Sequence, residues 1–198
     1  MVTVFDLGKV ILDFDRRTIT GRLARISRIP QRQVDDLIFR GGLEEMYDRG
    51  ELSSRDFYRA VTGSLGIDIP FEAFKAIWTE IFAANEEVCE VVRTLSKHYR
   101  LLLLSNTNEM HFDYVLGVFE ILRIFDDYVL SYKVGERKPH PKIYEAVLER
   151  AQCPAGDCVY IDDMEENVMA ARRLGIQGIV YRNGDQLRRS LRAFRVDI

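Results

Sequence analysis

The chain has 198 residues with a formal net charge of −3, and 47% of its residues are hydrophobic while 30% are charged. This length suits one full hydrophobic core with a small accessory unit, and the composition is that of a globular protein. The mildly acidic balance excludes a broad basic surface for nucleic acid or anionic membranes, and no run approaches the roughly 18 apolar residues of a membrane span.

The cysteines indicate a reducing environment. The chain has three cysteines, Cys89, Cys153 and Cys158. Because their number is odd and their spacing is not the CxxC of a metal or redox site, we interpret them as structural thiols. The first apolar stretch ends after about five residues at Asp6, which is too short for a signal peptide. We therefore expect a cytoplasmic protein.

The first element in chain order is a short strand. Val2–Phe5 is a β-branched and aromatic run that ends on Asp6 and turns through Leu7-Gly8-Lys9. A carboxylate at this point would project at the carboxyl edge of a sheet, where ligands bind in open α/β folds. Alone, such an Asp is more often a turn former or a helix cap, so the interpretation depends on the rest of the chain.

From about residue 16 to 86 the periodicity predicts only helices. Apolar residues fall at helical spacing in residues 19–26, 57–65 and 71–82, and we interpret the aromatic residues of the last stretch as core. Residues 53–56, Ser-Ser-Arg-Asp, resemble a capping box before the second of these stretches. We expect a four-helix bundle inserted after the first strand.

From about residue 87 onward helical and strand patterns alternate. Predicted helices at 88–97, 108–117, 141–150 and 166–174 are followed by apolar strands at 101–105, 128–131, 158–161 and 178–181. This alternation is typical of a parallel sheet covered by helices. Because the first strand belongs with these, we expect a discontinuous α/β core of residues 1–15 and 87–198, interrupted by a helical unit of residues 16–86.

Three further polar clusters lie at the ends of apolar runs. Asp162 and Asp163 follow the predicted strand 158–161, and two adjacent carboxylates repel one another unless a cation offsets them. With Asp6 they could supply oxygen ligands for Mg²⁺, or they could simply cap the next helix. Ser105 and Asn106 end the strand 101–105, where they could hold a phosphoryl oxygen or cap a helix.

The remaining cluster is Arg137-Lys138-Pro139. A lysine held before this proline could offset the charge of an anionic nucleophile and of a phosphate. Taken singly, it would be an ordinary surface residue.

Together, in this order, the clusters resemble the four motifs of the haloacid dehalogenase superfamily of phosphotransfer hydrolases. The similar segments are 5–15 (FDLGKVILDFD), 104–107 (LSNT), 137–139 (RKP) and 160–167 (YIDDMEEN). The helical insertion resembles the family's C1-type cap. The resemblance is closest to the branch that includes bacterial sugar-phosphate phosphatases and is related to the N-terminal domain of soluble epoxide hydrolase. It implies a Rossmann-like parallel sheet with strand order 3-2-1-4-5.

The resemblance also implies an Mg²⁺-dependent phosphatase acting on a small phosphorylated metabolite. Asp6 would be the nucleophile that forms an aspartyl-phosphate, and it would bind the metal together with the backbone carbonyl of Gly8. Asp163 would be the better metal ligand of its pair, with Asp162 assisting and Asn167 bracing the site.

The other implied roles concern the phosphoryl group. Ser105 and Asn106 would position it, and Lys138 would neutralise its charge. We expect the cap to close over this edge of the sheet, with residues 40–42 and 48–50 as loops that face the site.

One departure from the family pattern concerns proton transfer. Phosphatases of this superfamily usually carry a second Asp two residues after the nucleophile, as general acid and base, but here Gly8 is followed by Lys9. A positioned acid contributes about 10²–10⁴ in rate. The substrate could have a good leaving group, as in a sugar 1-phosphate, or Asp13 or Asp15 could donate the proton, or the protein could be a binder of low activity.

Two other classes share part of the pattern. Metal-free haloacid dehalogenases also lack the second Asp, but they usually have Ser where Asp162 and Asp163 stand, so the pair favours Mg²⁺ and phosphate. Response-regulator receivers need an acidic pair early in the chain, whereas this pair is late and a helical unit interrupts the sheet. The sequence does not specify a substrate or an oligomeric state.

Overall fold

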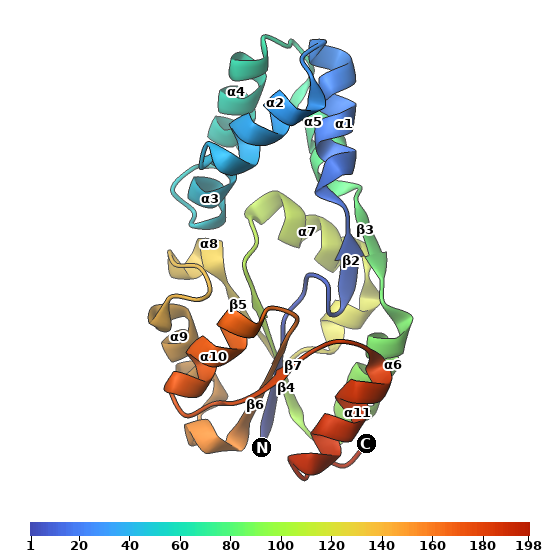
Figure 1. Cartoon of the computed structure of the whole chain (residues 1–198), viewed down its shortest axis with the longest axis vertical. Coiled ribbons are helices and arrows are strands. Elements are labelled where there is room, and N and C mark those ends of the chain that lie inside the picture. Colours follow the sequence, from blue (N-terminus) through green and yellow to red (C-terminus); the bar gives the residue numbers. More distant parts are fainter.

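The computed structural model describes residues 1–198 and contains a five-stranded parallel sheet (Figure 1). Its strands lie side by side in the order β5-β4-β1-β6-β7, which in chain order is 3-2-1-4-5, as predicted. The strands are β1 (Val2–Phe5), β4 (Arg100–Ser105), β5 (Asp127–Leu130), β6 (Cys158–Asp162) and β7 (Gln177–Val180).

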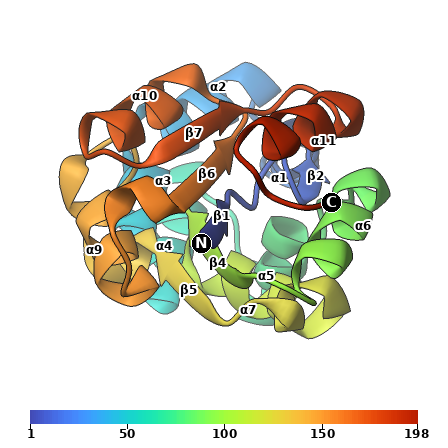
Figure 2. The same cartoon turned by 90° about the horizontal axis from the view of Figure 1, so that it is seen from below.

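Helices cover both faces of the sheet (Figure 2). On one face lie α6 (Glu86–Leu95), α7 (Glu109–Val118) and α11 (Gly184–Ala193), and on the other α9 (Pro141–Ala151) and α10 (Glu165–Arg173). The strands are apolar on both sides because each face is buried under helices. The α/β fold predicted from the alternating pattern is therefore correct. None of the helices in the structure is both long and apolar enough to cross a bilayer.

The segment after β1 forms a separate helical unit at the carboxyl ends of the strands, opposite the two chain termini (Figure 1). It has its own hydrophobic core, in which Trp78 packs edge-on against Phe57 with ring centroids 4.7 Å apart. Its elements are α1 (Arg16–Ser27), α2 (Gln31–Asp35), the π-helical η1 (Asp36–Arg40), α3 (Leu43–Asp48), α4 (Ser54–Leu65) and α5 (Phe71–Thr79). Ser53 caps α4, as predicted, by accepting a hydrogen bond from the Asp56 N–H at 3.1 Å.

The prediction of four helices in this unit was wrong, since it contains five α-helices. The additional helix arises because η1 ends at Gly41-Gly42, where Gly42 has φ +83°, and the chain then restarts as the six-residue α3. Glycine adopts this left-handed conformation at no steric cost. Ile26 follows the helical spacing of Ile19 and Leu23, but it is 43% exposed while those two are buried.

A two-stranded antiparallel ribbon joins the helical unit to the sheet, and it was not predicted. It pairs β2 (Leu12–Phe14) with β3 (Phe82–Ala84). The predicted helix therefore ends early, at Thr79, and Phe82 instead packs its ring on Phe14 at a centroid distance of 5.7 Å. The ribbon brings both ends of the helical unit together beside the end of β1.

Candidate active site

Three carboxylates converge where β1 and β6 end. Asp6, Asp162 and Asp163 each place an oxygen within 4.8 Å of the others, and only Asp163 is partly exposed. The backbone of Gly8 lines the same hollow as Asp6 and Asp163. Three negative charges at this spacing require cations to offset them, and carboxylate and carbonyl oxygens are the ligands that Mg²⁺ prefers. The donor set therefore fits a divalent ion.

Lys138 supplies one positive charge within this cluster. Its side chain is buried, and its Nζ donates to Asp6 Oδ1 at 2.7 Å and to Asp162 Oδ2 at 2.8 Å. The N–H of Leu7 also donates to Asp6 Oδ1 at 2.7 Å, so the second oxygen, Oδ2, has no hydrogen-bond donor within the chain. Asp6 thus has one oxygen fixed and one free to react or to bind a metal.

Asn106 holds the Lys138 segment in place. Its side-chain amide donates to the Lys138 carbonyl at 3.0 Å, and its Oδ1 accepts from the Lys138 N–H at 2.7 Å. Both ends of this amide are engaged by the backbone of Lys138, so its clearest role in the structure is to position that lysine, and its expected contact with the phosphoryl group stays a prediction. Ser105, in contrast, is buried at the end of β4, and its hydroxyl makes no hydrogen bond within the chain.

Asp162 has a different environment from Asp163. Besides Lys138, it accepts hydrogen bonds from the Tyr160 hydroxyl, from the Met164 N–H at 2.7 Å and from Asn167 Nδ2 at 3.1 Å. These donors occupy both of its oxygens, so it orients Lys138 and offers little to a metal. Asp163 lies at the edge of the hollow and is the more accessible ligand.

The charges of the cluster follow from burial and from these contacts. Burial raises the pKa of Asp6 to about 7, although Lys138 acts in the opposite direction. Burial also raises the pKa of Asp162, but Lys138 and Tyr160 outweigh it and the net pKa is low. For Lys138, burial lowers the pKa, yet the two carboxylates outweigh burial and raise it. One lysine therefore leaves the cluster negative, and a bound cation would complete the neutralisation.

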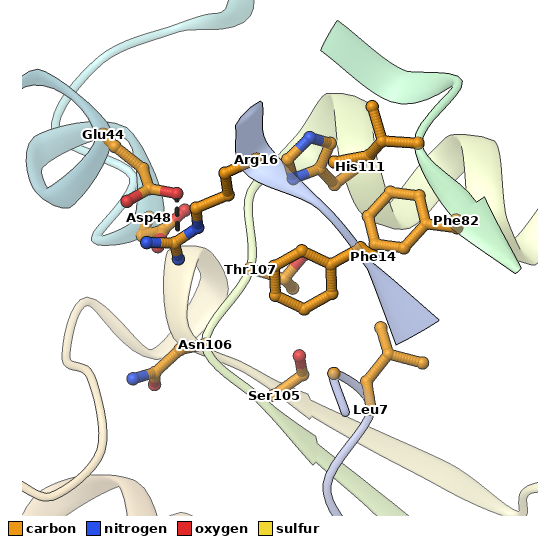
Figure 3. Close-up of a pocket in the computed structure, with 12 residues that line it drawn as sticks. Leu7, Phe14, Arg16, Glu44, Asp48, Phe82, Ser105, Asn106, Thr107 and His111 are labelled. Carbon is orange, nitrogen blue, oxygen red and sulfur yellow. Dashed lines mark ion pairs between the residues drawn. The ribbon is translucent and has the colours of Figure 1, made fainter. Parts of the chain in front are cut away.

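A second hollow adjoins the first. The outer hollow is lined by Asp6, Lys138 and Asp163, whereas the inner chamber, of about 40 Å³, lies between Ser105 and the helical unit (Figure 3). Such a volume holds about three water molecules. The two spaces share the following residues: Gly8, Phe14, Arg16 and Asn106.

Charged residues of the helical unit line the inner chamber, and the sequence analysis missed them. Glu44 and Asp48 lie one turn apart on α3, both buried, and point toward the chamber (Figure 3). Arg16 pairs with Glu44 at 3.1 Å, while Arg137 lies 3.6 Å from Asp48. Burial, with a contribution from Asp48, raises the pKa of Glu44 to about 7.

Asn108 and His111 of the core also contact this unit. Asn108 Nδ2 donates to Asp48 Oδ1 at 3.0 Å. His111 lines the chamber and stacks its ring on Trp78. Its Nε2 lies 2.9 Å from the backbone carbonyl oxygen of Trp78. Burial lowers the pKa of His111 to about 4, so its imidazole is neutral at physiological pH.

Neither carboxylate considered as a substitute proton donor reaches these spaces. Asp13 is exposed and lies 3.6 Å from Lys9, and Asp15 caps α1 by accepting from the Arg17 N–H at 2.9 Å. The position next to the nucleophile is filled by an aromatic ring instead. A Cβ atom added to Gly8 would lie only 2.8 Å from Phe14 Cε1.

The two loops expected to face the site behave differently. In residues 48–50, Asp48 lines the inner chamber, but Gly50 packs against the backbone of Tyr132. In residues 40–42, Arg40 is mostly exposed and pairs with Asp36 at 3.0 Å, so this part of the expectation was wrong. The cause is the short helix α3, which places its own acidic face over the chamber.

A parallel sheet with a helical unit inserted after its first strand and carboxylates at its carboxyl edge is typical of a class of hydrolases. The model of the haloacid dehalogenase-like hydrolase family matches residues 10–181, so the chain belongs to this family. The resemblance found in the four motifs is thereby confirmed.

Individual relatives cover nearly the whole chain. D-ribitol-5-phosphate phosphatase of Bacteroides thetaiotaomicron is 25% identical over 195 residues, 95% of each chain. The sesquiterpene phosphatase astK of Aspergillus oryzae is 24% identical over 182 residues, 89% of this chain and 87% of that one. Among solved structures, a haloacid dehalogenase family enzyme from B. thetaiotaomicron, in complex with magnesium and inorganic phosphate, superposes with a TM-score of 0.80 at 24% identity, covering 92% of this chain and 94% of that one.

Proposed function

We propose that this hydrolase is an Mg²⁺-dependent phosphatase that cleaves a small phosphorylated metabolite through an aspartyl-phosphate on Asp6. The observation that carries the proposal is the environment of Asp6. It has one oxygen held by Lys138 and Leu7, one oxygen free, and Asp163 within reach of a shared ion. The two phosphatase relatives, and the magnesium and phosphate bound in the solved neighbour, support the same reaction.

Asp6, Asp163 and the Gly8 carbonyl would hold the ion, and Asp162 would support them through Lys138. When bound, Mg²⁺ supplies positive charge that polarises the phosphoryl group and offsets the negative charge of the substrate. This charge is what the cluster lacks, because Lys138 alone faces three carboxylates.

The residues of the chain account for the remaining steps. The free oxygen of Asp6 attacks phosphorus, the P–O bond to the leaving group breaks, and the departing oxygen takes a proton from solvent. Water then attacks the phosphorus of the aspartyl-phosphate, releases a proton to solvent, and frees phosphate and the Asp6 carboxylate. Lys138 stabilises the charge that spreads over the phosphoryl oxygens, and the Ser105 hydroxyl donates to one of them. Lys138 is held by two buried carboxylates, so it needs little reorganisation during the reaction, and the Ser105 hydroxyl has no competing partner within the chain.

The leaving oxygen receives no proton from position 8, since Gly8 has no side chain. Esters whose leaving oxygen is a weak base therefore react best, and a sugar 1-phosphate is one such substrate.

We further propose that residues 16–86 act as a cap over a core of residues 1–15 and 87–198. The three free cysteines support a cytoplasmic location.

A screen of monophosphate esters tests the proposal. Sugar phosphates, nucleotides and p-nitrophenyl phosphate are incubated with the protein and Mg²⁺, and released phosphate is measured. We expect hydrolysis that EDTA abolishes and Mg²⁺ restores. If no ester is hydrolysed although Mg²⁺ binds, the protein is a phosphometabolite-binding member of the family rather than a phosphatase. Hydrolysis that persists in EDTA would exclude the metal.

A further inference from the structure

The inner chamber differs in chemistry from the outer hollow beside Asp6. Its wall on the helical unit consists of Glu44 and Asp48, and each carboxylate already has a guanidinium partner, Arg16 at 3.1 Å and Arg137 at 3.6 Å. Because an arginine lies beside each carboxylate, a second ionic group on a ligand would find no isolated charge of opposite sign there. The chamber therefore favours a neutral ligand over a cationic or an anionic one.

This neutral ligand must also be able to donate hydrogen bonds. Each carboxylate has about four acceptor sites, which are not filled by Arg16 beside Glu44 or by Arg137 and Asn108 Nδ2 beside Asp48. Both side chains are more than nine-tenths buried, so an apolar ligand that displaced the water would leave these acceptors unsatisfied. Hydroxyl groups would replace the lost water, since each hydroxyl donates one hydrogen bond and also accepts from groups such as Arg16.

The opposite wall of the chamber is aromatic, which suits the C–H groups of a hydroxylated carbon chain. Phe14 and Phe82 present tilted rings, 5.7 Å between centroids, across the chamber from the carboxylates (Figure 3). Such rings pack against C–H groups while the polar wall binds hydroxyls. The volume of about 40 Å³ admits only the few carbon and hydroxyl groups of a leaving group that lie next to the phosphoryl group, so a long hydrocarbon chain does not fit inside the chamber in this arrangement.

We propose that Glu44 and Asp48 are specificity-determining residues that bind hydroxyl groups of the leaving group, so that the substrate is the phosphate ester of a small neutral polyol or sugar. The inference rests on the proposed phosphatase function, because it takes the phosphoryl group to lie beside Asp6 and the leaving group to extend into the inner chamber. The two spaces adjoin at Gly8 and Arg16, which line both.

Two esters of equal length test this assignment. A five-carbon polyol monophosphate and n-pentyl phosphate differ only in their hydroxyl groups. For the intact protein with Mg²⁺, we expect kcat/KM for the polyol ester to be at least about tenfold higher, the value of one hydrogen bond to a charged group. Equal or faster hydrolysis of n-pentyl phosphate by the wild-type protein overturns the proposal without any variant.

Matched variants locate the effect. Glu44→Gln and Asp48→Asn keep the shape of each side chain, and each should lower the polyol-to-pentyl ratio of kcat/KM about tenfold. Glu51→Gln makes the same chemical change just after α3, where the side chain is largely exposed and pairs with Arg49 at 3.6 Å, and it should leave the ratio unchanged. A ratio that stays at the wild-type value in both Glu44→Gln and Asp48→Asn, with both proteins folded, contradicts the assignment.

Calorimetric titration of the same two esters, with Mg²⁺ present, separates this inference from the phosphatase proposal. If no ester is hydrolysed, but the polyol ester still binds at least about tenfold more tightly than the pentyl ester and Glu44→Gln removes the difference, the phosphatase proposal fails and the chamber assignment stands. If esters are hydrolysed but bind with equal affinity, the chamber assignment fails and the phosphatase proposal stands.

Discussion

The absence of an acid at Gly8 is coupled to the position of Phe14, and this predicts how the acid can be restored. A Cβ at position 8 would lie 2.8 Å from Phe14 Cε1, closer than carbon atoms approach, and the Phe14 ring is itself packed on Phe82. We therefore expect Gly8→Asp alone to destabilise the protein by about 1–3 kcal/mol, the usual effect of overpacking, with no gain in activity.

Relieving the contact should change this result. In Gly8→Asp combined with Phe14→Leu, the new carboxyl has room, and a positioned acid lowers the barrier for alkyl esters by about 3–5 kcal/mol, or 10²–10⁴ in rate. The measurement is kcat/KM for n-pentyl phosphate and for p-nitrophenyl phosphate, whose leaving oxygen needs little protonation. We expect the alkyl ester to gain at least about 10²-fold over the aryl ester.

Phe14→Leu alone is the control, and it should not raise alkyl turnover selectively. The reasoning would be refuted if Gly8→Asp alone gave the full gain, because Phe14 would then not occupy the place of the acid. It would equally be refuted if wild-type protein hydrolysed alkyl and aryl esters at equal rates, since another group would then donate the proton.

Three other results are expected. Lys138→Met leaves Asp6 and Asp162 buried without their cation, so urea unfolding should show a decrease of about 3–5 kcal/mol in the free energy of unfolding at pH 8. The decrease should be smaller at pH 5, where Asp6 takes up a proton, and equal decreases at the two pH values would contradict the ion cluster. The pKa of His111 is lowered from 6.5 to about 4, so its contribution to stability is present above pH 6.5 and lost as the pH falls to 4. Wild-type protein should then lose about 3 kcal/mol more than His111→Gln over this range, and parallel pH profiles would argue against the shift. Asp163→Asn should raise the Mg²⁺ concentration needed for half-maximal activity at least about tenfold, and an unchanged requirement would remove Asp163 from the metal ligands.

The sheet could be predicted from local sequence because its strands are buried on both faces. Residues 101–105 and 158–161 are continuous apolar runs between helical patterns, and the observed strands β4 and β6 match them to within one residue at each end. The order of the strands came from the family resemblance rather than from the pattern. The ribbon β2–β3 was missed because three-residue strands carry no periodic signal. The helices η1 and α3 were not predicted separately because each is too short to show a helical period.

The candidate site, like the fold, contains some residues that could be predicted from the sequence and others that could not. Asp6, Lys138 and Asp163 stand at the ends of recognisable elements, so their convergence follows from the topology of a parallel sheet. Glu44 and Asp48 had no such signal, because they face the chamber only through the packing of α3 over distant parts of the chain. Arg137 was a partial exception, since it belongs to the Arg137-Lys138-Pro139 motif, but its partner on α3 could not be inferred from sequence.

The most direct test of the central claim is to detect the covalent intermediate on Asp6. Protein turning over p-nitrophenyl phosphate with Mg²⁺ is quenched in acid and digested, and the N-terminal peptide is examined by mass spectrometry. We predict a mass increase of one phosphoryl group that maps to Asp6, and neither the adduct nor turnover in Asp6→Asn, because an amide is not a competent nucleophile. Turnover by Asp6→Asn at the wild-type rate would contradict the aspartyl-phosphate mechanism.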